Sequence, residues 1–449
     1  MDIETLSNYV NTYGNRYQGM SRAPVYVYAM SFIYLLSGKE HFMLGVNLLN
    51  LILFISSLLL IYKYMLKKFP EQHIAHLAAI LWIGGSFTLF EYSFGAWLES
   101  FTMFNFVIVF LLHMHLLKRD QNPVWQYLLY ALAVASLFTI KRSNMPIAAA
   151  FILHFIFQKN YRRFIMVSLF FGIFITLWYG LRYYVMQIPP LYPFSHSFPY
   201  SGYSHTVSAI PRVLFSAKQI ADVSAKFLQI SLNLKNLGLL FPFVLLYLAG
   251  NPNDKEKQII WLLLFTNYGI YALSRGNPNP RYIFPIFVPL IINGASYLDK
   301  TIRKLFPNKA IIPTYVILMF TFFFQVKEIA NFIQWVPVAG NVRNEVFAAA
   351  DDVLDANNVP DEAIVLCNIH GYNVYTKRGY ILTPPNTTIE NKQQILDLYD
   401  VDYVLHYLGL THYLGWNEYT VKVDQFYDLP QAEIVSSNPW VRLYKVPKE

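Results

Sequence analysis

Residues 43–62 read MLGVNLLNLILFISSLLLIY, and this stretch decides the fold class. It carries no charged side chain, and about 20 apolar residues are what a helix needs to cross a membrane. Lys63, Lys67 and Lys68 follow directly and mark the end of the apolar run. The stretch therefore predicts a transmembrane helix with a basic loop behind it.

The composition of the whole chain agrees with this start. Of the 449 residues, 55% are hydrophobic and only 14% are charged, whereas soluble proteins carry about 25% charged residues. This balance excludes a single soluble domain, a disordered chain and a fibrous one. The single cysteine, Cys367, also excludes an internal disulfide framework and a metal site built from cysteines.

Ten apolar runs predict about ten transmembrane helices. They are residues 43–62, 74–90, 101–117, 127–139, 145–157, 164–179, 237–248, 259–273, 282–297 and 311–324. A further run, 23–36, contains Pro24, Ser31 and three tyrosines, so we expect a helix that lies at the membrane interface.

The basic residues predict the orientation. The loops after residues 62, 117, 157, 248 and 297 hold 14 Lys and Arg, whereas the three short loops on the other side hold four. Because basic loops stay in the cytoplasm, the amino terminus, the loop 187–236 and the carboxyl-terminal tail are expected on the outer side. Basic residues confined to short loops do not favour nucleic-acid binding.

The tail differs from the rest of the chain. After residue 340 there are 8 Lys and Arg against 15 Asp and Glu, whereas the preceding residues hold 27 against 12. Helices are expected at 344–357 and 391–398, and strands at 363–367, 403–406, 433–436 and 441–446. The predicted fold is an all-α polytopic membrane domain, residues 1–339, with outer loops at 1–42 and 187–236. A small α/β outer domain, residues 340–449, follows it.

Ionisable residues near the predicted outer helix ends are candidate functional residues, since charge at membrane depth is costly. They are Asp2, Glu4, Arg22, Glu91, Glu99, Lys141, Arg142, Arg182 and Arg281. Carboxylates that face fixed cations suit a reaction on an anionic lipid headgroup, where the cations hold phosphate and a carboxylate moves a proton. Two alternatives stay open: each arginine could be an interfacial anchor, and Glu91 and Glu99 could be solvated loop residues.

Five short motifs, in this order and on the predicted outer side, resemble polytopic glycosyltransferases with the GT-C fold. They are residues 21–26 (SRAPVY) with 35–38 (LLSG), 98–101 (LESF), 178–183 (WYGLRY), 279–285 (NPRYIFP) with 288–289 (VP), and 401–405 (VDYVL). The third has one extra residue before its arginine. The protein mannosyltransferase and lipid A aminoarabinose transferase type is the most similar in appearance.

The resemblance implies an inverting enzyme that moves a sugar from a polyprenyl-phosphate carrier to a lipid, glycan or protein acceptor. Asp2 stands where the family has an essential acid after a first transmembrane helix, so we expect either such a helix upstream of it or an amino terminus that is translocated unaided. The resemblance implies that Asp2 is the general base and that Glu99 assists it, either by positioning the reacting groups or by holding a divalent cation. Carrier phosphate and sugar are expected to contact Arg22, Lys141, Arg142, Arg182, Arg281 and Tyr282.

The expected function is thus sugar transfer on the outer face of a cell membrane, bacterial or archaeal. A lipid-linked glycan ligase or polymerase is the nearest alternative. Its donor is also carried by a lipid, but it is a whole glycan on a diphosphate carrier. A membrane transporter is another, although such proteins are often built from repeated halves and no internal repeat is visible here. The histidines show no metal-ligand spacing.

Overall fold

The structure is a computed structural model that describes residues 24–85, 99–118, 121–141, 144–186, 217–232, 237–251, 253–274, 280–307, 311–367, 379–382, 401–407, 433–438 and 441–447. The chain divides into two units. The first, here called the helical unit, comprises Arg22–Leu181 and Ile210–Phe332. The second, called the sheet unit, comprises Met1–Ser21, Arg182–Ala209 and Ile333–Glu449. The division into domains 1–339 and 340–449 stays a prediction.

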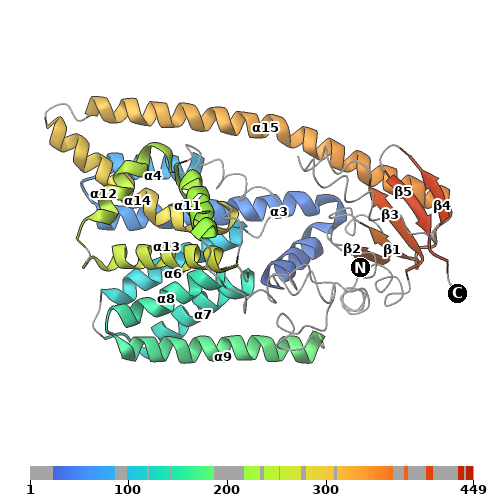
Figure 1. Cartoon of the computed structure of the whole chain (residues 1–449), viewed down its shortest axis with the longest axis horizontal. Coiled ribbons are helices and arrows are strands. Elements are labelled where there is room, and N and C mark those ends of the chain that lie inside the picture. The colour runs from blue at the N-terminus through green and yellow to red at the C-terminus, as the bar shows by residue number, and fades with distance from the viewer. Residues whose placement is uncertain are drawn as a thin grey trace. The chain divides into compact units, whose positions relative to one another are not determined.

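Helices account for nearly all the described residues before the tail (Figure 1). They are α3 (Pro24–Lys68), α4 (His73–Gly85), α6 (Glu99–Leu117), α7 (Val124–Ile140), α8 (Met145–Phe157), α9 (Tyr161–Met186), α11 (Ala217–Leu232), the short 3₁₀ helix η4 (Gly238–Leu240), α12 (Phe241–Ala249), α13 (Lys255–Ser274), α14 (Pro280–Leu305) and α15 (Ile311–Ala356). Each of the ten predicted apolar runs overlaps one or two of these helices, and residues 86–90 of the second run lie outside the described part of the chain.

Three described segments are long and apolar enough to cross a membrane, judged by length and composition. They are Leu44–Lys68 of α3, Glu99–Leu117, and Tyr161–Trp178 of α9. Shorter apolar helices are His73–Gly84, Val124–Ile140, Met145–Phe157 and Gly238–Ala249. The mostly helical, membrane-capable architecture is therefore confirmed, while the number of crossings stays a prediction.

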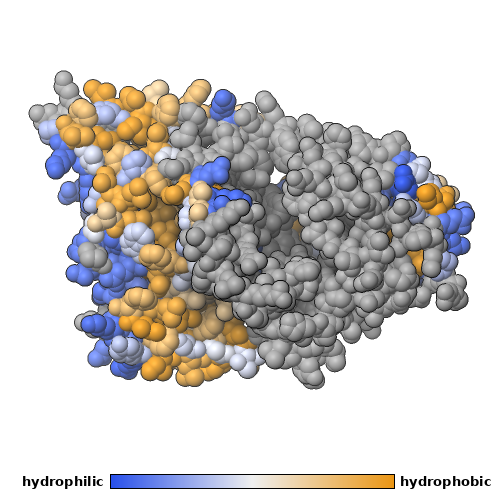
Figure 2. Space-filling view, in the orientation of Figure 1, coloured by the Kyte–Doolittle hydropathy of each residue, from blue (hydrophilic) through white to orange (hydrophobic). Residues whose placement is uncertain are grey.

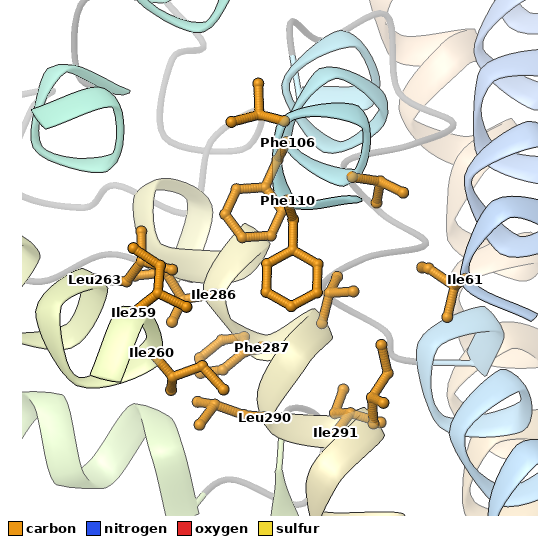
Figure 3. Close-up of a cluster of buried hydrophobic side chains, with 14 of the residues drawn as sticks. Ile61, Phe106, Phe110, Ile259, Ile260, Leu263, Ile286, Phe287, Leu290 and Ile291 are labelled. Atoms are coloured by element: carbon orange, nitrogen blue, oxygen red, sulfur yellow. The ribbon is translucent and has the colours of Figure 1, made fainter. Parts of the chain in front are cut away.

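The core of the helical unit is built from large apolar side chains of several helices (Figure 3). Phe106 and Phe110 of α6 lie among Ile260 of α13 and Phe287 and Ile291 of α14, and all five are at most 3% exposed. Lipid tails are as apolar as these side chains, so close packing rather than the hydrophobic effect must hold such helices together in a membrane.

Close packing is visible where α14 meets α12. A Cβ atom on Gly294 would lie 2.8 Å from Cγ2 of Val244, closer than real Cβ atoms approach. The absence of a side chain at this position therefore lets the two helices come together, as small residues do at membrane helix interfaces.

One face of α3 is apolar and exposed. Leu44, Leu48, Ile52, Ile55 and Leu59 recur at helical spacing and are each at least 46% exposed. On the face that Figure 2 shows, hydrophobic residues cover much of the described part of the helical unit, and a hydrophilic rim borders them at one edge. A large exposed apolar surface marks an interaction surface, and on helices long enough to cross a membrane it suits contact with lipid.

α3 contains a sharp bend, which Figure 1 shows in the first blue helix. Gly38 has φ 69° and ψ 176°, so the helix predicted at 23–36 is distinct from the membrane-capable part of α3. The two parts approach closely beyond the bend, since a Cβ on Gly45 would lie 2.7 Å from Cγ2 of Ile33. A helix at this position is confirmed, and its place at the membrane interface stays a prediction.

The sheet unit contains a mixed five-stranded sheet with the order β2-β1-β3-β5-β4. The strands are β1 (Ile364–Cys367), β2 (Gly379–Leu382), β3 (Tyr403–Tyr407), β4 (Glu433–Ser437) and β5 (Val441–Lys445). β1 pairs in parallel with β2 and β3, and β5 pairs antiparallel with β3 and β4. Four of these strands match the predicted ones. β2 was not predicted.

Three further points on the tail concern Asp402 and the two predicted helices. Asp402, from the motif at 401–405, accepts a 2.8 Å hydrogen bond from the backbone N–H of Ile364 and so fixes the start of β1 beside β3. The helix predicted at 344–357 is the end of α15, which runs without a break from Ile311. The helix predicted at 391–398 lies outside the described residues.

Candidate functional site

A buried ion pair joins two of the predicted site residues. Nζ of Lys141 lies 2.5 Å from Oε1 of Glu99. Glu99 is the first residue of α6, and Lys141 directly follows α7. The Glu99 side chain is fully buried, and that of Lys141 is 10% exposed. The sequence predicted these residues separately; the structure brings them together.

The backbone explains why Lys141 faces α6. α7 ends at Ile140, and Lys141 takes an extended conformation with φ −152° and ψ 120°. Its N–H still donates to the carbonyl of Leu137 at 3.3 Å, so the residue stays attached to the last turn of α7. α8 begins at Met145, only four residues later, with a proline in its first turn. Lys141 therefore lies between the end of α7 and the start of α8, where it reaches Glu99 of α6.

Asn144 ties the three helices together at this point. Its Nδ2 donates to Oγ1 of Thr102 on α6 at 3.3 Å and to the carbonyl of Leu137 on α7 at 3.1 Å. Its backbone N–H donates to the carbonyl of Lys141 at 2.9 Å. Asn144 is the residue just before α8, and it is 1% exposed. It therefore fixes the backbone from which Lys141 projects.

A second buried hydrogen bond fixes the neighbour of Glu99. Oγ of Ser100 donates to Oδ1 of Asn50 on α3 at 2.6 Å, and both residues are at most 1% exposed. The sequence analysis missed Asn50, Ser100, Thr102 and Asn144, because neutral polar residues occur throughout the chain. Only their burial shows that they belong to this cluster, which we call the Glu99 cluster: Asn50, Glu99, Ser100, Thr102, Lys141 and Asn144.

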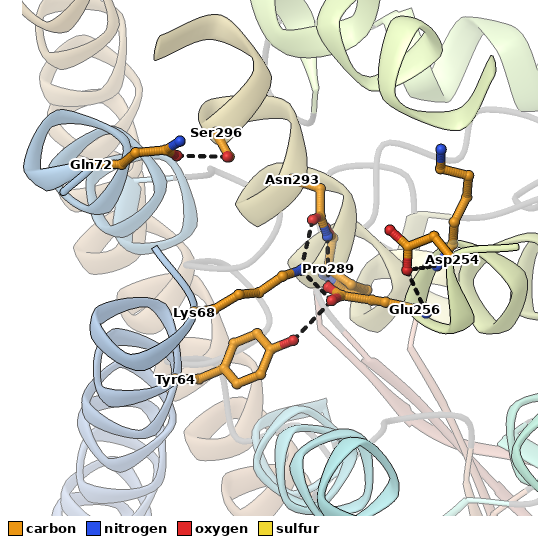
Figure 4. Close-up of polar contacts among 9 residues, drawn as sticks. Tyr64, Lys68, Gln72, Asp254, Glu256, Pro289, Asn293 and Ser296 are labelled. Atoms are coloured by element: carbon orange, nitrogen blue, oxygen red, sulfur yellow. Dashed lines mark hydrogen bonds and ion pairs between the residues drawn. The ribbon is translucent and has the colours of Figure 1, made fainter. Parts of the chain in front are cut away.

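The opposite end of the helical unit has its own buried polar network (Figure 4). Glu256 of α13 accepts hydrogen bonds from Tyr64 at 2.9 Å and Asn293 at 2.8 Å, and forms an ion pair with Lys68. Nζ of Lys68 also donates to Oδ1 of Asn293 at 3.0 Å. These contacts join α3, α13 and α14, so their evident role is structural.

Further contacts bring the five basic loops to this same end. Ser296 of α14 donates to Gln72 at 2.6 Å, and Arg303 donates to the carbonyl of Glu71 at 3.3 Å. Lys255 donates to the carbonyl of Leu117 at 3.3 Å, and Gln158 bonds to Gln258. The loops after α3, α6, α8, α12 and α14 therefore lie together, as the orientation prediction requires of loops on one side of a membrane.

The length of α6 separates the two ends. Its 19 residues span about 28 Å at 1.5 Å per residue, close to the roughly 30 Å hydrocarbon core of a bilayer. Leu117, at one end, accepts from Lys255, and Glu99 begins the other end. The Glu99 cluster thus lies about one membrane thickness from the basic loops.

The structure describes the remaining predicted site residues only by their backbone position, or not at all. Arg182 lies in the last turns of α9, and Arg281 and Tyr282 lie in the first turn of α14. Asn293 and Arg303 of α14 belong to the end with the basic loops, so the backbone of Arg281 lies toward the opposite end of that helix. Asp2, Glu4, Arg22, Glu91 and Arg142 lie outside the described residues.

A buried chain of histidines inside the bundle also escaped the sequence analysis. Nδ1 of His113 lies 2.7 Å from the hydroxyl of Tyr130, and Nε2 lies 2.8 Å from Nδ1 of His154. The three residues link α6, α7 and α8 and are fully buried. Within the described part of the chain, no three His, Cys, Asp or Glu side chains group as metal ligands would.

Comparisons with known proteins show the fold. No family model matches the sequence, and no curated protein matches it. Among solved structures, ArnT from Cupriavidus metallidurans bound to undecaprenyl phosphate matches with a TM-score of 0.61 and 10% identity, over 94% of this chain and 87% of that one. The apo form of the same protein matches with a TM-score of 0.57 and 10% identity, over 95% and 87%. The chain therefore has an ArnT-like GT-C fold, as the motifs predicted.

Proposed function

We propose that this chain, with its ArnT-like fold, is an integral-membrane glycosyltransferase that takes a sugar from a polyprenyl-phosphate carrier. One observation carries the proposal: a buried carboxylate–ammonium pair, Glu99–Lys141, at the end of the helical unit opposite the basic loops. The matched ArnT structure was crystallised with undecaprenyl phosphate, and this supports a lipid-phosphate ligand here. The acceptor is proposed to react on the outer face of the membrane.

The proposed reaction is a single displacement at the anomeric carbon. An acceptor hydroxyl attacks this carbon from the side opposite the phosphate, and the bond between the carbon and the phosphate oxygen breaks. The bonding pair leaves with polyprenyl phosphate, the anomeric configuration inverts, and the hydroxyl proton passes to Asp2. A positioned carboxylate that accepts a proton in this way contributes roughly 10²- to 10⁴-fold to the rate.

The proposed cations act on the leaving group. Negative charge grows on the carrier phosphate as the sugar departs, and fixed cations stabilise that charge in the transition state. We assign this role to Arg281, with Lys141 and Arg182; Arg22 and Arg142 are further candidates. Glu99 positions Lys141, and Tyr282 contacts the sugar. A divalent cation at Glu99 stays an alternative.

The proposed topology has ten crossings, with the outer loops 1–42 and 187–236 and the α/β domain 340–449 on the outer side of a bacterial or archaeal cell membrane. Two features support it. The five basic loops lie at one end of the helical unit, bound to one another through α13 and α14. Glu99 lies at the other end of a helix about as long as a bilayer core is thick.

The test is consumption of lipid-linked sugars by the purified protein in detergent. We expect at least one polyprenyl-phosphate sugar to be consumed with release of polyprenyl phosphate. Release of polyprenyl diphosphate from a glycan carrier would instead identify a ligase or polymerase. No consumption of either donor type, together with substrate flux in vesicles, would identify a transporter and contradict the proposal.

A further inference from the structure

Lys141 has a charged partner within the protein. Its ammonium contacts a carboxylate at 2.5 Å inside the protein, so the pair is close to electrically neutral. A lysine meant only to hold a phosphate would present an uncompensated positive charge to it. Glu99 must therefore affect how Lys141 binds a phosphate.

The two partners differ in accessibility. The Lys141 side chain is 10% exposed and the Glu99 side chain is fully buried. An incoming anion can thus contact the Lys141 side chain more readily than the carboxylate of Glu99. Phosphate and carboxylate oxygens are alternative acceptors for the same N–H donors, so the two groups compete for Lys141.

From this geometry we infer that the carrier phosphate replaces Glu99 as the partner of Lys141 when the donor binds. This inference rests on the proposed function. The ammonium turns from Oε1 of Glu99 to a phosphate oxygen, and the carboxylate keeps its buried place at the start of α6. No covalent bond changes in this step.

The surrounding contacts allow such an exchange without movement of the backbone. Asn144 bonds to Thr102 and to the carbonyl of Leu137, so the turn that carries Lys141 stays fixed. Ser100 bonds to Asn50 and holds the start of α6 in the same way. The flexible four-carbon stem of Lys141 can turn, and lysine suits this better than the planar, forked arginine.

The exchange also bears on release of the product. A polyprenyl-phosphate sugar is a phosphodiester with one negative charge, whereas the product polyprenyl phosphate carries nearly two at pH 7, as other phosphomonoesters do. Glu99 competes with both for Lys141. Its return to Lys141 therefore helps to release the more highly charged product.

The experiment is a measurement of polyprenyl phosphate affinity with the full-length protein in detergent. The variants are Glu99→Gln, Lys141→Met and the double variant. Removal of the competing carboxylate should tighten binding about tenfold, because close charge pairs couple at least this strongly. Lys141→Met should weaken binding, and Glu99→Gln should have no further effect in the Lys141→Met background. The double variant serves as the check on folding, since it removes both charges of the pair.

Glu256→Gln is the matched control. It removes a carboxylate from the other buried lysine pair, Lys68–Glu256, with the same change in net charge, and should leave the affinity unchanged. If that variant does not fold, Glu433→Gln on the exposed β4 strand takes its place.

Three results would overturn the inference, and they differ in their meaning for the proposed function. If wild type binds polyprenyl phosphate and Glu99→Gln binds it equally or more weakly, the exchange is wrong and the proposed function stands. If no folded variant, wild type included, binds polyprenyl phosphate, both are wrong. Tightening that persists in the double variant would also contradict the exchange, because it would not act through Lys141.

Discussion

At the scale of single residues, the buried charges of Glu99 and Lys141 affect both the stability of the protein and the proposed chemistry. Removing an ion from water costs several kcal/mol, and its partner repays this only in good geometry. The 2.5 Å contact between Lys141 and Glu99, set in a frame of buried hydrogen bonds from Asn144 and Ser100, provides such geometry. The pair therefore matters to stability as well as to the proposed chemistry.

Lys141→Met removes the ammonium and leaves the carboxylate of Glu99 buried. We expect this variant to lose about 3–5 kcal/mol of unfolding free energy, the usual effect of removing one partner of a buried pair. The double variant Glu99→Gln/Lys141→Met should recover most of that loss. Denaturant unfolding in detergent, followed by tryptophan fluorescence, measures both. Equal losses in the single and double variants would show that the pair does not act as a unit.

Arg281 is assigned to the carrier phosphate, and its replacement should reveal this. Arg281→Ala should weaken donor binding about tenfold or more, since hydrogen bonds to charged groups contribute about 1.5–3 kcal/mol. Arg281→Lys should restore part of the affinity, because a lysine keeps the charge and loses the bidentate fork. Lys118→Ala, next to Leu117 at the end with the basic loops, is the control and should leave binding as it is. Identical affinities for all four proteins would remove Arg281 from the site.

The site was only partly predictable from the sequence. Glu99 and Lys141 could be identified one by one, since a charge at the end of an apolar helix is conspicuous. Their pairing could not, because the two residues are 42 positions apart and meet only through the packing of α6 against the end of α7. Asn50, Thr102 and Asn144 could not be identified from the sequence, because an uncharged polar residue is a candidate site residue only once its burial is known.

At the scale of elements, α3 shows how one residue sets a helix direction. Gly38 has φ 69°, a left-handed conformation that residues with a Cβ adopt at a cost. No atom lies within 4 Å of where a Cβ would stand. A substitution at Gly38 therefore meets no steric obstacle, and its whole effect must come from the backbone.

Gly38→Ala should destabilise the protein by about 1–3 kcal/mol, the cost of a strained backbone conformation. Gly172→Ala is the matched control: this glycine lies inside α9, also has open space around its Cβ position and has no positive φ. There alanine should be neutral or stabilising, because it is the better helix former. Thermal unfolding in detergent compares the two. Equal midpoints for both variants would contradict the role of the bend.

The elements themselves were largely predictable. Long apolar runs gave the helices, since a helix that crosses or lines a membrane needs about 20 such residues. β2 was missed because Gly379–Leu382 is only four residues long and pairs at the edge of the sheet, where its pattern is too short to separate from a loop. Two separate helices, 311–324 and 344–357, were expected where the structure has the single helix α15, Ile311–Ala356. The polar residues between them end the apolar run, but they do not end the helix.

At the scale of the whole molecule, the proposed reaction requires that the Glu99 end and the tail lie on the outer side of the membrane. The charge bias of the loops predicts that the five loops brought together through α13 and α14 are cytoplasmic. A reporter enzyme fused after Leu305 should therefore be active in the cytoplasm, and one fused after Glu449 should be active outside. A cytoplasmic signal from the Glu449 fusion would reverse the orientation and place the tail on the wrong side for the proposed reaction.

The central claim is sugar transfer from a polyprenyl-phosphate donor at the end of the molecule that carries Glu99. Single-turnover assays of the purified protein in detergent test it most directly, with transferred sugar and released polyprenyl phosphate measured together. We predict equal amounts of the two products for wild type and Lys118→Ala, and a rate lower by about 10²- to 10⁴-fold for Asp2→Asn, which cannot accept the hydroxyl proton. Absence of polyprenyl phosphate release by wild type with every lipid-linked sugar tested, or an unchanged rate in the Glu99→Gln/Lys141→Met variant, would contradict it.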